Sequence, residues 1–151
     1  MKEENKESIR KIKHEFMVFR NGIVADALRK SGIPFDYIFG LQLPQISSIA
    51  KEKGQNYELA LELWNDSNVR ESRLLAIYLF PASQISIKEA IKLMDSVKTR
   101  EEAEILSFRL LRNTPFSQEL LETMKKEDHE QSPLTKYCVK MLERNLNTII
   151  S

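Results

Sequence analysis

The chain has 151 residues, of which 42% are hydrophobic and 30% charged, and its 23 basic and 22 acidic residues leave a net charge of +1. This composition is that of an ordinary soluble globular chain, and the length predicts a single domain with one continuous core. The near balance of charge excludes a protein that holds a nucleic-acid duplex through a large excess of basic residues, so any such contact requires basic residues gathered on one face.

Residues 1–54 are predicted to form the N-terminal helices. A charged helix over residues 3–20 is expected to bury one stripe of apolar side chains at helical spacing: Ile9, Ile12, Phe16 and Phe19. A second helix is expected to end at Gly32, because glycine readily adopts the left-handed conformation that terminates helices. After an aromatic-rich connector, Pro44 is well placed as the first residue of a third helix, which Gly54 closes.

Residues 56–81 have the clearest pattern in the chain. They predict two helices, each with one apolar stripe, joined by a polar corner at residues 65–68. Asn68 precedes Glu71 by three residues, the spacing of a capping box in which two side chains satisfy each other's backbone N–H groups. Pro81 then ends the second helix. Such a hairpin cannot bury its own apolar face, so it is expected to stack on another hairpin.

Two further helix pairs are predicted over residues 86–113 and 114–149. Their helix starts are marked by a polar cap followed by a glutamate or a proline: Ser86–Glu89, Thr99–Glu102, Thr114–Pro115 and Ser132–Pro133. The second helix of each pair recurs at intervals of roughly 30 residues, a spacing that is typical of helix-pair repeats. The chain has only four glycines and shows no sustained period-two alternation. The sequence therefore predicts an all-α fold of stacked antiparallel helix pairs.

The hairpin over residues 56–81 also carries the pattern of a known family. The pattern is Ala-x-x-Leu-Trp, a polar corner and Arg-Glu-x-Arg-x-x-Ala, carried by Ala60, Leu63, Trp64, Arg70, Glu71, Arg73 and Ala76. It resembles the AlkD-like DNA alkylation repair family, HEAT-like helical-repeat proteins whose studied members are alkylpurine DNA glycosylases. The resemblance implies a short, divergent member with a single HEAT-like repeat domain over residues 1–151, wound as an α-α superhelix.

The resemblance further implies where chemistry would take place. In the family, an aromatic residue, a carboxylate and an arginine act together, and the carboxylate stabilises the positive charge that develops as the base leaves. Glu104 occupies the matching carboxylate position, whereas Arg100 stands where the family has a tryptophan. Lys136 is the cation in the later segment, where the family has an arginine pair. The sequence leaves open whether the chain is an active glycosylase with Glu104 as its catalytic residue or a catalytically degenerate member.

Basic residues recur on the helices expected to line the inner face of the array. The resemblance implies that they contact duplex DNA: Arg70, Arg73, Lys88, Arg100, Arg109, Arg112, Lys136 and Lys140. The alternative is that they are solvated and pair with nearby glutamates. Glu104, Phe108 and Arg112 follow one another at intervals of four residues along one line of a helix. They either line a groove or are helix-end charges flanking a core phenylalanine.

The remaining reactive residues favour ordinary structural roles. Cys138 is the single cysteine and lies among apolar residues, so we expect a buried thiol and no disulfide. His14 and His129 are isolated in the sequence, so neither a metal nor another cofactor is expected. No apolar run is long enough for a membrane span and the N-terminus lacks a secretion signal, so we expect no membrane partner and a cytoplasmic location.

Three functions from different classes remain open. The first is a DNA-binding repeat protein that is related to the glycosylases but lacks catalysis. The second is an active glycosylase that removes a cationic alkylated base. The third is a protein–protein interaction module without DNA binding, a common use of helical arrays. Salt-dependent binding to duplex DNA separates the first two from the third, and release of a methylated purine separates the second from the first.

Overall fold

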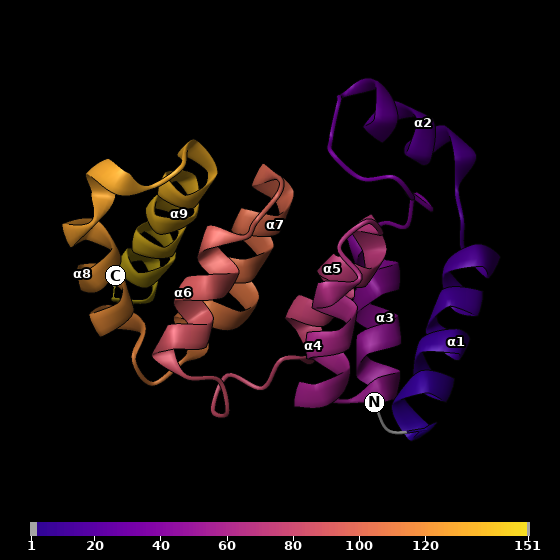
Figure 1. The fold of residues 1–151 in the computed structure, drawn as a ribbon, viewed down its shortest axis with the longest axis horizontal. Coiled ribbons are helices and arrows are strands. Elements are labelled where there is room, and N and C mark those ends of the chain that lie inside the picture. The colour runs from indigo at the N-terminus through magenta and orange to yellow at the C-terminus, as the bar shows by residue number, and fades with distance from the viewer. Residues whose placement is uncertain (1–2, 151) are drawn as a thin grey trace. The chain divides into compact units, whose positions relative to one another are not determined.

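The computed structural model describes residues 3–150, and within that range every regular element is a helix (Figure 1). Extended pairing among these residues is limited to an isolated parallel bridge between Tyr37 and Val69. The all-α fold predicted from the sequence is therefore confirmed, whereas the superhelical stacking of HEAT-like repeats stays a prediction. The helices divide into two compact units, which meet in the sequence between Phe80 and Pro81.

The first unit has a core of helices packed side by side. Its elements are α1 Glu3–Val18, α2 Gly22–Lys30, α3 Leu43–Lys53, α4 Tyr57–Asn65 and α5 Arg70–Leu79. α5 packs against α3 and α4 (Figure 1). α1 packs against α4. Leu63, Leu74 and Leu75 are completely buried in this core. Because full burial of one leucine side chain stabilises a fold by roughly 1.5–3 kcal/mol, this packing supplies much of the unit's stability.

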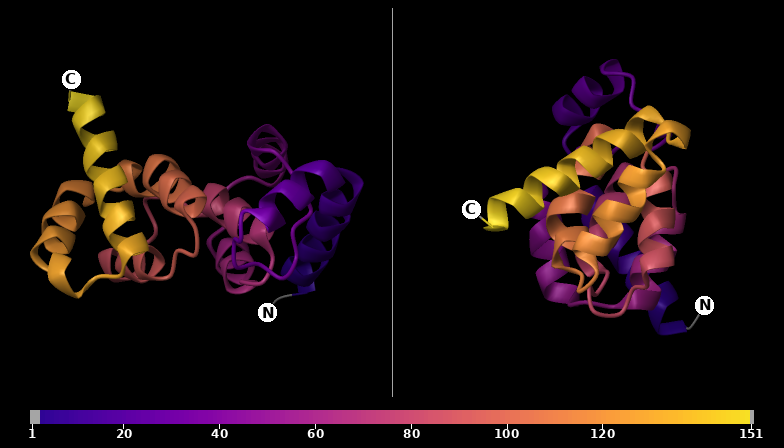
Figure 2. Two further views of the ribbon diagram at one scale, coloured as in Figure 1. Left: turned by 90° about the horizontal axis from the view of Figure 1, so that it is seen from above. Right: turned by 90° about the vertical axis from the view of Figure 1, so that its left-hand side faces the viewer.

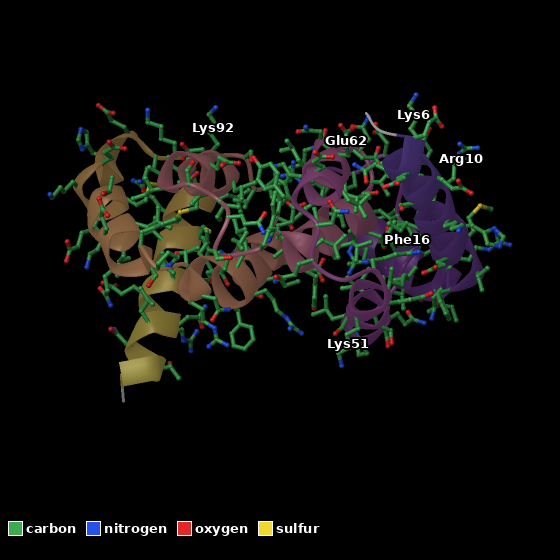
Figure 3. The ribbon with its side chains drawn as sticks, turned by 90° about the horizontal axis from the view of Figure 1, so that it is seen from below. Lys6, Arg10, Phe16, Lys51, Glu62 and Lys92 are labelled. Carbon is green, nitrogen blue, oxygen red and sulfur yellow. The ribbon has the colours of Figure 1, made fainter. Side chains whose placement is uncertain are left out.

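Helix α1 presents apolar residues to the core and charged residues to solvent. Ile12 and Phe16 are completely buried, while Lys6 and Arg10 project outward from the helix (Figure 3). The prediction that Phe19 continues the buried stripe is wrong, because its side chain is 44% exposed. The helix ends at Val18, so Phe19 lies beyond its last turn and no longer follows the helical spacing.

The predicted capping box between Asn68 and Glu71 is also wrong. Val69 is the N-cap residue of α5, and no side chain caps this helix. Glu71 is instead fully buried and accepts hydrogen bonds from the backbone N–H groups of Phe39 and Gly40, each at 3.0 Å. The connector between α2 and α3, residues 31–42, lies against the start of α5. The N–H groups of the connector therefore occupy the Glu71 carboxylate, which in a capping box would accept from the N–H of Asn68.

A buried ion pair reinforces this attachment. Arg70 Nη1 lies 2.7 Å from Glu71 Oε2 and also donates a hydrogen bond to the carbonyl of Leu41 at 3.0 Å. Arg70 is 4% exposed and Glu71 is completely buried. Removing one partner of such a pair costs about 3–5 kcal/mol, since the other charge is then left in the interior without compensation. The pair therefore ties the connector firmly to α5.

The second unit is built around the long C-terminal helix. Its elements are α6 Ile87–Asp95, α7 Arg100–Ile105, a π-helical turn η1 Leu106–Leu110, a 3₁₀ turn η2 Leu111–Asn113, α8 Ser117–Lys126, a 3₁₀ turn η3 Asp128–Glu130 and α9 Pro133–Ile150. α9 packs against α6, α7 and α8 (Figure 2). Ala103, Cys138 and Leu142 are completely buried in this core. The buried thiol predicted at Cys138 is thus confirmed.

Two predicted helix caps are confirmed in this unit, one of them only in part. Ser86 Oγ accepts from the N–H of Glu89 at 3.1 Å, and the Glu89 carboxylate accepts from the N–H of Ser86 at 3.2 Å. Thr99 Oγ1 accepts from the N–H of Glu102 at 3.1 Å. The Glu102 carboxylate, however, accepts from the N–H of Lys98 at 2.8 Å and so completes a different pairing.

The two cap-and-proline predictions have different outcomes. α9 begins at Pro133, and Ser132 Oγ accepts from the N–H of Thr135 at 3.2 Å, as the sequence predicts. The start predicted at Thr114–Pro115 is wrong, because α8 begins at Ser117. The Thr114 hydroxyl donates to the carbonyl of Leu111 at 2.8 Å, so this side chain ends the preceding helical segment instead of starting the next one.

The helix predicted over residues 100–113 changes its winding along its length. It runs as an α-helix to Ile105, as a π-helical turn to Leu110 and as a 3₁₀ turn to Asn113. Ser107 Oγ donates to the carbonyl of Glu104 at 3.2 Å and accepts from Asn145 Nδ2 of α9 at 2.8 Å. π-helical turns are uncommon and occur frequently at functional sites, which directs attention to this segment.

Candidate functional site

Glu104 and Tyr137 meet on the surface where α7 packs against α9. The Tyr137 hydroxyl donates a hydrogen bond to Glu104 Oε1. The backbones beneath are held by the core, where the buried Cys138 Sγ lies 3.8 Å from the carbonyl of Ala103. Because Ala103 precedes Glu104 and Cys138 follows Tyr137, this contact fixes the two side chains opposite each other. The pairing thus follows from the packing of the helices beneath it.

Positive charge flanks this carboxylate. The Arg100 guanidinium lies over the Tyr137 ring, with its Cζ 4.9 Å from the ring centroid. The hydrogen bond to Glu104 raises the pKa of Tyr137, burial and the Glu104 charge add to the rise, and the positive charges of Arg100 and Arg144 oppose it. Arg144 is therefore close enough to act on the same hydroxyl. Two exposed arginines, Arg100 and Arg144, therefore act on the hydroxyl that binds the Glu104 carboxylate.

A second arginine–aromatic pair lies along the same helical segment. Arg112 Cζ is 3.8 Å from the centroid of the Phe108 ring, and Phe108 is 47% exposed. Of the two alternatives for Phe108, the structure therefore supports a side chain at the surface and not one packed in the core. Stacking holds the half-buried guanidinium of Arg112 in place.

Helix α9 extends this surface with further cations. Lys136, Lys140 and Arg144 are all exposed. Lys140 and Arg144 are four residues apart on the helix, and both line the same shallow pocket on its surface. Residues four apart on a helix share a face, so these two side chains continue from Tyr137 along α9. We use the name basic aromatic surface for Arg100, Glu104, Phe108, Arg112, Tyr137, Lys140 and Arg144.

The remaining predicted DNA contacts lie elsewhere in their units. Lys88 on α6 and Arg109 on η1 are exposed and lie outside the set of residues named above. Arg70 and Arg73 are buried, with 4% and 3% of their surface exposed. Arg73 stacks on the Trp64 ring at 3.5 Å and donates to the Trp64 carbonyl at 3.3 Å. Its guanidinium group is therefore engaged by contacts inside the first unit.

Sequence patterns did not single out Tyr137 as the partner of Glu104 or include Arg144 in the site. Both lie on α9, seven residues apart, a spacing that places them on one face of that helix. This spacing is the sequence pattern that could have grouped the two residues. The contact with Glu104 joins residues 33 positions apart in the chain, however, and a pattern within one helix does not report it.

Two further features bear on the chemistry of the described residues. The described part of the chain contains no cluster of three or more histidine, cysteine, aspartate or glutamate side chains that could hold a metal ion. In the same range there is no helix with the length and hydrophobicity needed to cross a lipid bilayer.

Comparison with known proteins identifies one family. A family model described as DNA alkylation repair enzyme matches residues 12–130. Comparisons with curated proteins and with solved structures find no match. The matched range takes in Arg100, Glu104, Phe108 and Arg112 and ends before Tyr137.

Proposed function

The chain belongs to the DNA alkylation repair enzyme family, and from this premise we propose that it binds duplex DNA through the basic aromatic surface of its second unit. The observation that carries the proposal is a pair of guanidinium groups stacked on aromatic rings, the exposed Arg100 on Tyr137 and the half-buried Arg112 on the exposed Phe108. A guanidinium group has a planar set of donors that matches a phosphate, and stacking preorganises it so that less entropy is lost on binding.

The placement of the cations supports a backbone contact. Arg100 and Arg112 belong to one helical segment, while Lys140 and Arg144 belong to the adjoining α9. Cations on neighbouring helices present several contacts to one strand of phosphates, and such contacts position a protein on a duplex without reading its sequence. We therefore expect binding with little preference for base sequence.

Glu104 gives the same surface a second candidate function, that of a glycosylase. Its carboxylate is held by the Tyr137 hydroxyl on the exposed side of the helices, where a DNA strand would pass. A fixed carboxylate in that place can stabilise positive charge on a sugar as a base departs. In a purely binding protein the same negative charge would only repel phosphates.

The binding proposal is tested by fluorescence anisotropy with a labelled duplex. Arg100→Gln and Arg144→Gln should each weaken binding several-fold, since each removes one charge that would face a phosphate. Lys92→Gln is the matched control, because Lys92 is an exposed cation of α6 in the same unit (Figure 3). The surface is not a DNA contact if all three variants bind the duplex with wild-type affinity, or if the wild-type chain binds no duplex. A protein partner would then be the better candidate.

Glu104→Gln decides between binding and catalysis. In a binding protein, loss of the negative charge should strengthen duplex binding, because repulsion of the phosphates is removed. In a glycosylase it should abolish the release of methylated purines from alkylated DNA. Affinity should rise in both cases, so the loss of base release is the result that identifies a glycosylase. The absence of any release by the unchanged chain at high protein concentration would exclude the second.

A further inference from the structure

The first unit contains a cleft whose lining differs from the rest of its surface. It lies between α2 and the connector, has a volume of about 390 Å³, and is lined by Arg20, Arg29, Tyr37 and Phe39 together with the backbone around Gly22. A volume of this size falls within the range of small-ligand sites.

The walls of this cleft are held by hydrogen bonds. Tyr37 donates its N–H to the carbonyl of Asn68 at 3.0 Å and accepts from the N–H of Arg70 at 3.2 Å, which fixes its backbone to the start of α5. On the next residues of the connector, the buried Glu71 carboxylate holds the N–H groups of Phe39 and Gly40. The buried ion pair of α5 therefore holds the connector in one conformation, because its carboxylate binds the connector backbone.

Helix α2 is attached to the same wall. Arg29 Nη2 donates to the carbonyl of Ile38 at 3.2 Å, and the N–H of Asn21 donates to the carbonyl of Phe39 at 2.8 Å. The start and the end of the helix are thus both bonded to adjacent residues of the connector. A ligand would therefore meet a cleft that is already formed and would lose little affinity to ordering its walls.

The exposed side chains in the cleft combine two kinds of recognition. Tyr37 is 62% exposed although its backbone is fixed, so its ring is available to a planar ligand. Arg20 is exposed and forms no ion pair with any residue in the described range. Arg29 is partly neutralised by Asp26, whose Oδ1 lies 3.1 Å from its Nη1. The net positive charge at the cleft is therefore carried chiefly by Arg20.

From this arrangement we propose that the cleft binds a nucleotide, with the base against Tyr37 and the phosphate at Arg20. An aromatic ring offers a stacking surface to any base, and a guanidinium group recognises a phosphate through directed hydrogen bonds. The nucleotide is either free or an unpaired nucleotide of a DNA strand. This inference goes beyond the proposed function, since it uses the first unit and none of the residues of the basic aromatic surface.

The ligand is tested by titrating the full chain with three probes: deoxyadenosine monophosphate, deoxyadenosine and inorganic phosphate. Because base stacking on an aromatic side chain contributes roughly 1–3 kcal/mol, the monophosphate should bind at least about fivefold more tightly than inorganic phosphate. It should also bind more tightly than deoxyadenosine, which lacks the phosphate that Arg20 would contact. A duplex with one unpaired adenosine, compared with the fully paired duplex, separates the two sources. Preference for the unpaired duplex without binding of the free monophosphate assigns the cleft to a DNA strand.

Two variants locate the site. Tyr37→Leu removes the stacking ring. Gly22→Leu adds a bulky side chain at the lining of the cleft, and the fold should tolerate it because a Cβ at Gly22 meets no atom within 4 Å and its backbone is not in the left-handed region. Ala27→Leu is the matched control, since Ala27 is an exposed residue of the same helix that does not line the cleft. Circular dichroism and urea denaturation check that each variant retains the fold.

The expected result is a loss of at least about fivefold in nucleotide affinity for Tyr37→Leu and Gly22→Leu, with Ala27→Leu unchanged. Binding of inorganic phosphate as tight as measurable binding of the monophosphate, or full binding by Gly22→Leu, would overturn the proposal. So would the absence of both free-nucleotide binding and preference for the unpaired duplex. The Arg100→Gln variant keeps the two hypotheses apart, because it should weaken duplex binding and leave binding of the free monophosphate unchanged.

Discussion

Gly40 is the glycine whose backbone other atoms approach most closely. Its φ of +86° lies in the left-handed region, and a Cβ built there would be 2.3 Å from the carbonyl oxygen of Asn21 and 2.9 Å from the nitrogen of Ala25. The connector and the start of α2 therefore run in direct contact at this point. Glycine alone permits both this conformation and this approach.

We expect Gly40→Ala to lower the free energy of unfolding by at least about 2 kcal/mol, because the left-handed conformation costs a side-chain-bearing residue roughly 1–2 kcal/mol before the clash is relieved. Urea denaturation followed by Trp64 fluorescence measures the loss. Gly54→Ala is the matched control, since Gly54 has a φ of +72° but open space around a built Cβ. Equal losses in the two variants would show that the close approach contributes nothing.

The thiol of Cys138 gives a pH-dependent prediction for the second unit. Burial, followed by the negative charge of Asp95, raises the pKa of this thiol from 9.0 to about 12. Because the folded-state pKa is the higher one, the thiol's contribution to stability is fully present below about pH 9 and is lost as the pH rises towards about 12.

We accordingly expect a disulfide reagent at pH 8 to modify Cys138 in the native chain at least about a hundredfold more slowly than in urea, since only the thiolate reacts. The absorbance of the released chromophore gives both rates, and the reaction in urea confirms that the thiol is intact. Rapid modification of the native chain would mean that the core between α7 and α9 opens readily.

At the scale of elements, the start of α6 depends on its capping box. We expect Ser86→Ala to destabilise the chain by about 1 kcal/mol, because the N–H of Glu89 then loses its partner. Ser83→Ala serves as the control, since Ser83 is an exposed residue of the preceding turn. Urea midpoints of the two variants give the comparison. A loss no greater than that of the control would assign the stability of α6 to its packing alone.

Local signals predicted the helices well because they act within a few residues. Each helix start after Ser86, Thr99 and Ser132 is indicated by a cap residue and a glutamate or proline within three residues of it, and the structure confirms all three starts. The predictions failed where a distant group took the local partner. Glu71 binds the connector instead of Asn68, and the π-helical turn is bonded to a side chain of α9. No window along the sequence contains those partners.

The candidate site was predictable in part, for the same reason. The spacing of Glu104, Phe108 and Arg112 indicated one line of a helix, and the contact between Phe108 and Arg112 agrees with it. Tyr137 joins Glu104 only through the packing of two helices. Arg73 looks basic and helical in sequence, yet it is 3% exposed. Whether an arginine faces solvent or stacks on a buried tryptophan depends on tertiary structure.

At the scale of the whole molecule, a net charge of +1 leaves no strong overall field to draw in a polyanion. Binding to DNA must then arise from the local cluster, and its salt dependence counts the phosphates that the cluster neutralises. With Arg100, Arg112, Lys140 and Arg144 as the contacts, the logarithm of the binding constant should fall with the logarithm of salt concentration with a slope of about −3.6, each contact contributing about 0.9.

Anisotropy titrations of one duplex between about 50 and 200 mM salt measure this slope. Arg144→Gln should make it shallower by about 0.9, whereas Lys92→Gln, which alters net charge equally, should leave it unchanged. That pairing separates a local contact from a general charge effect, because both variants remove one positive charge from the second unit. Equal changes in the two slopes would mean that net charge governs binding, and an unchanged slope for Arg144→Gln would remove this residue from the contact.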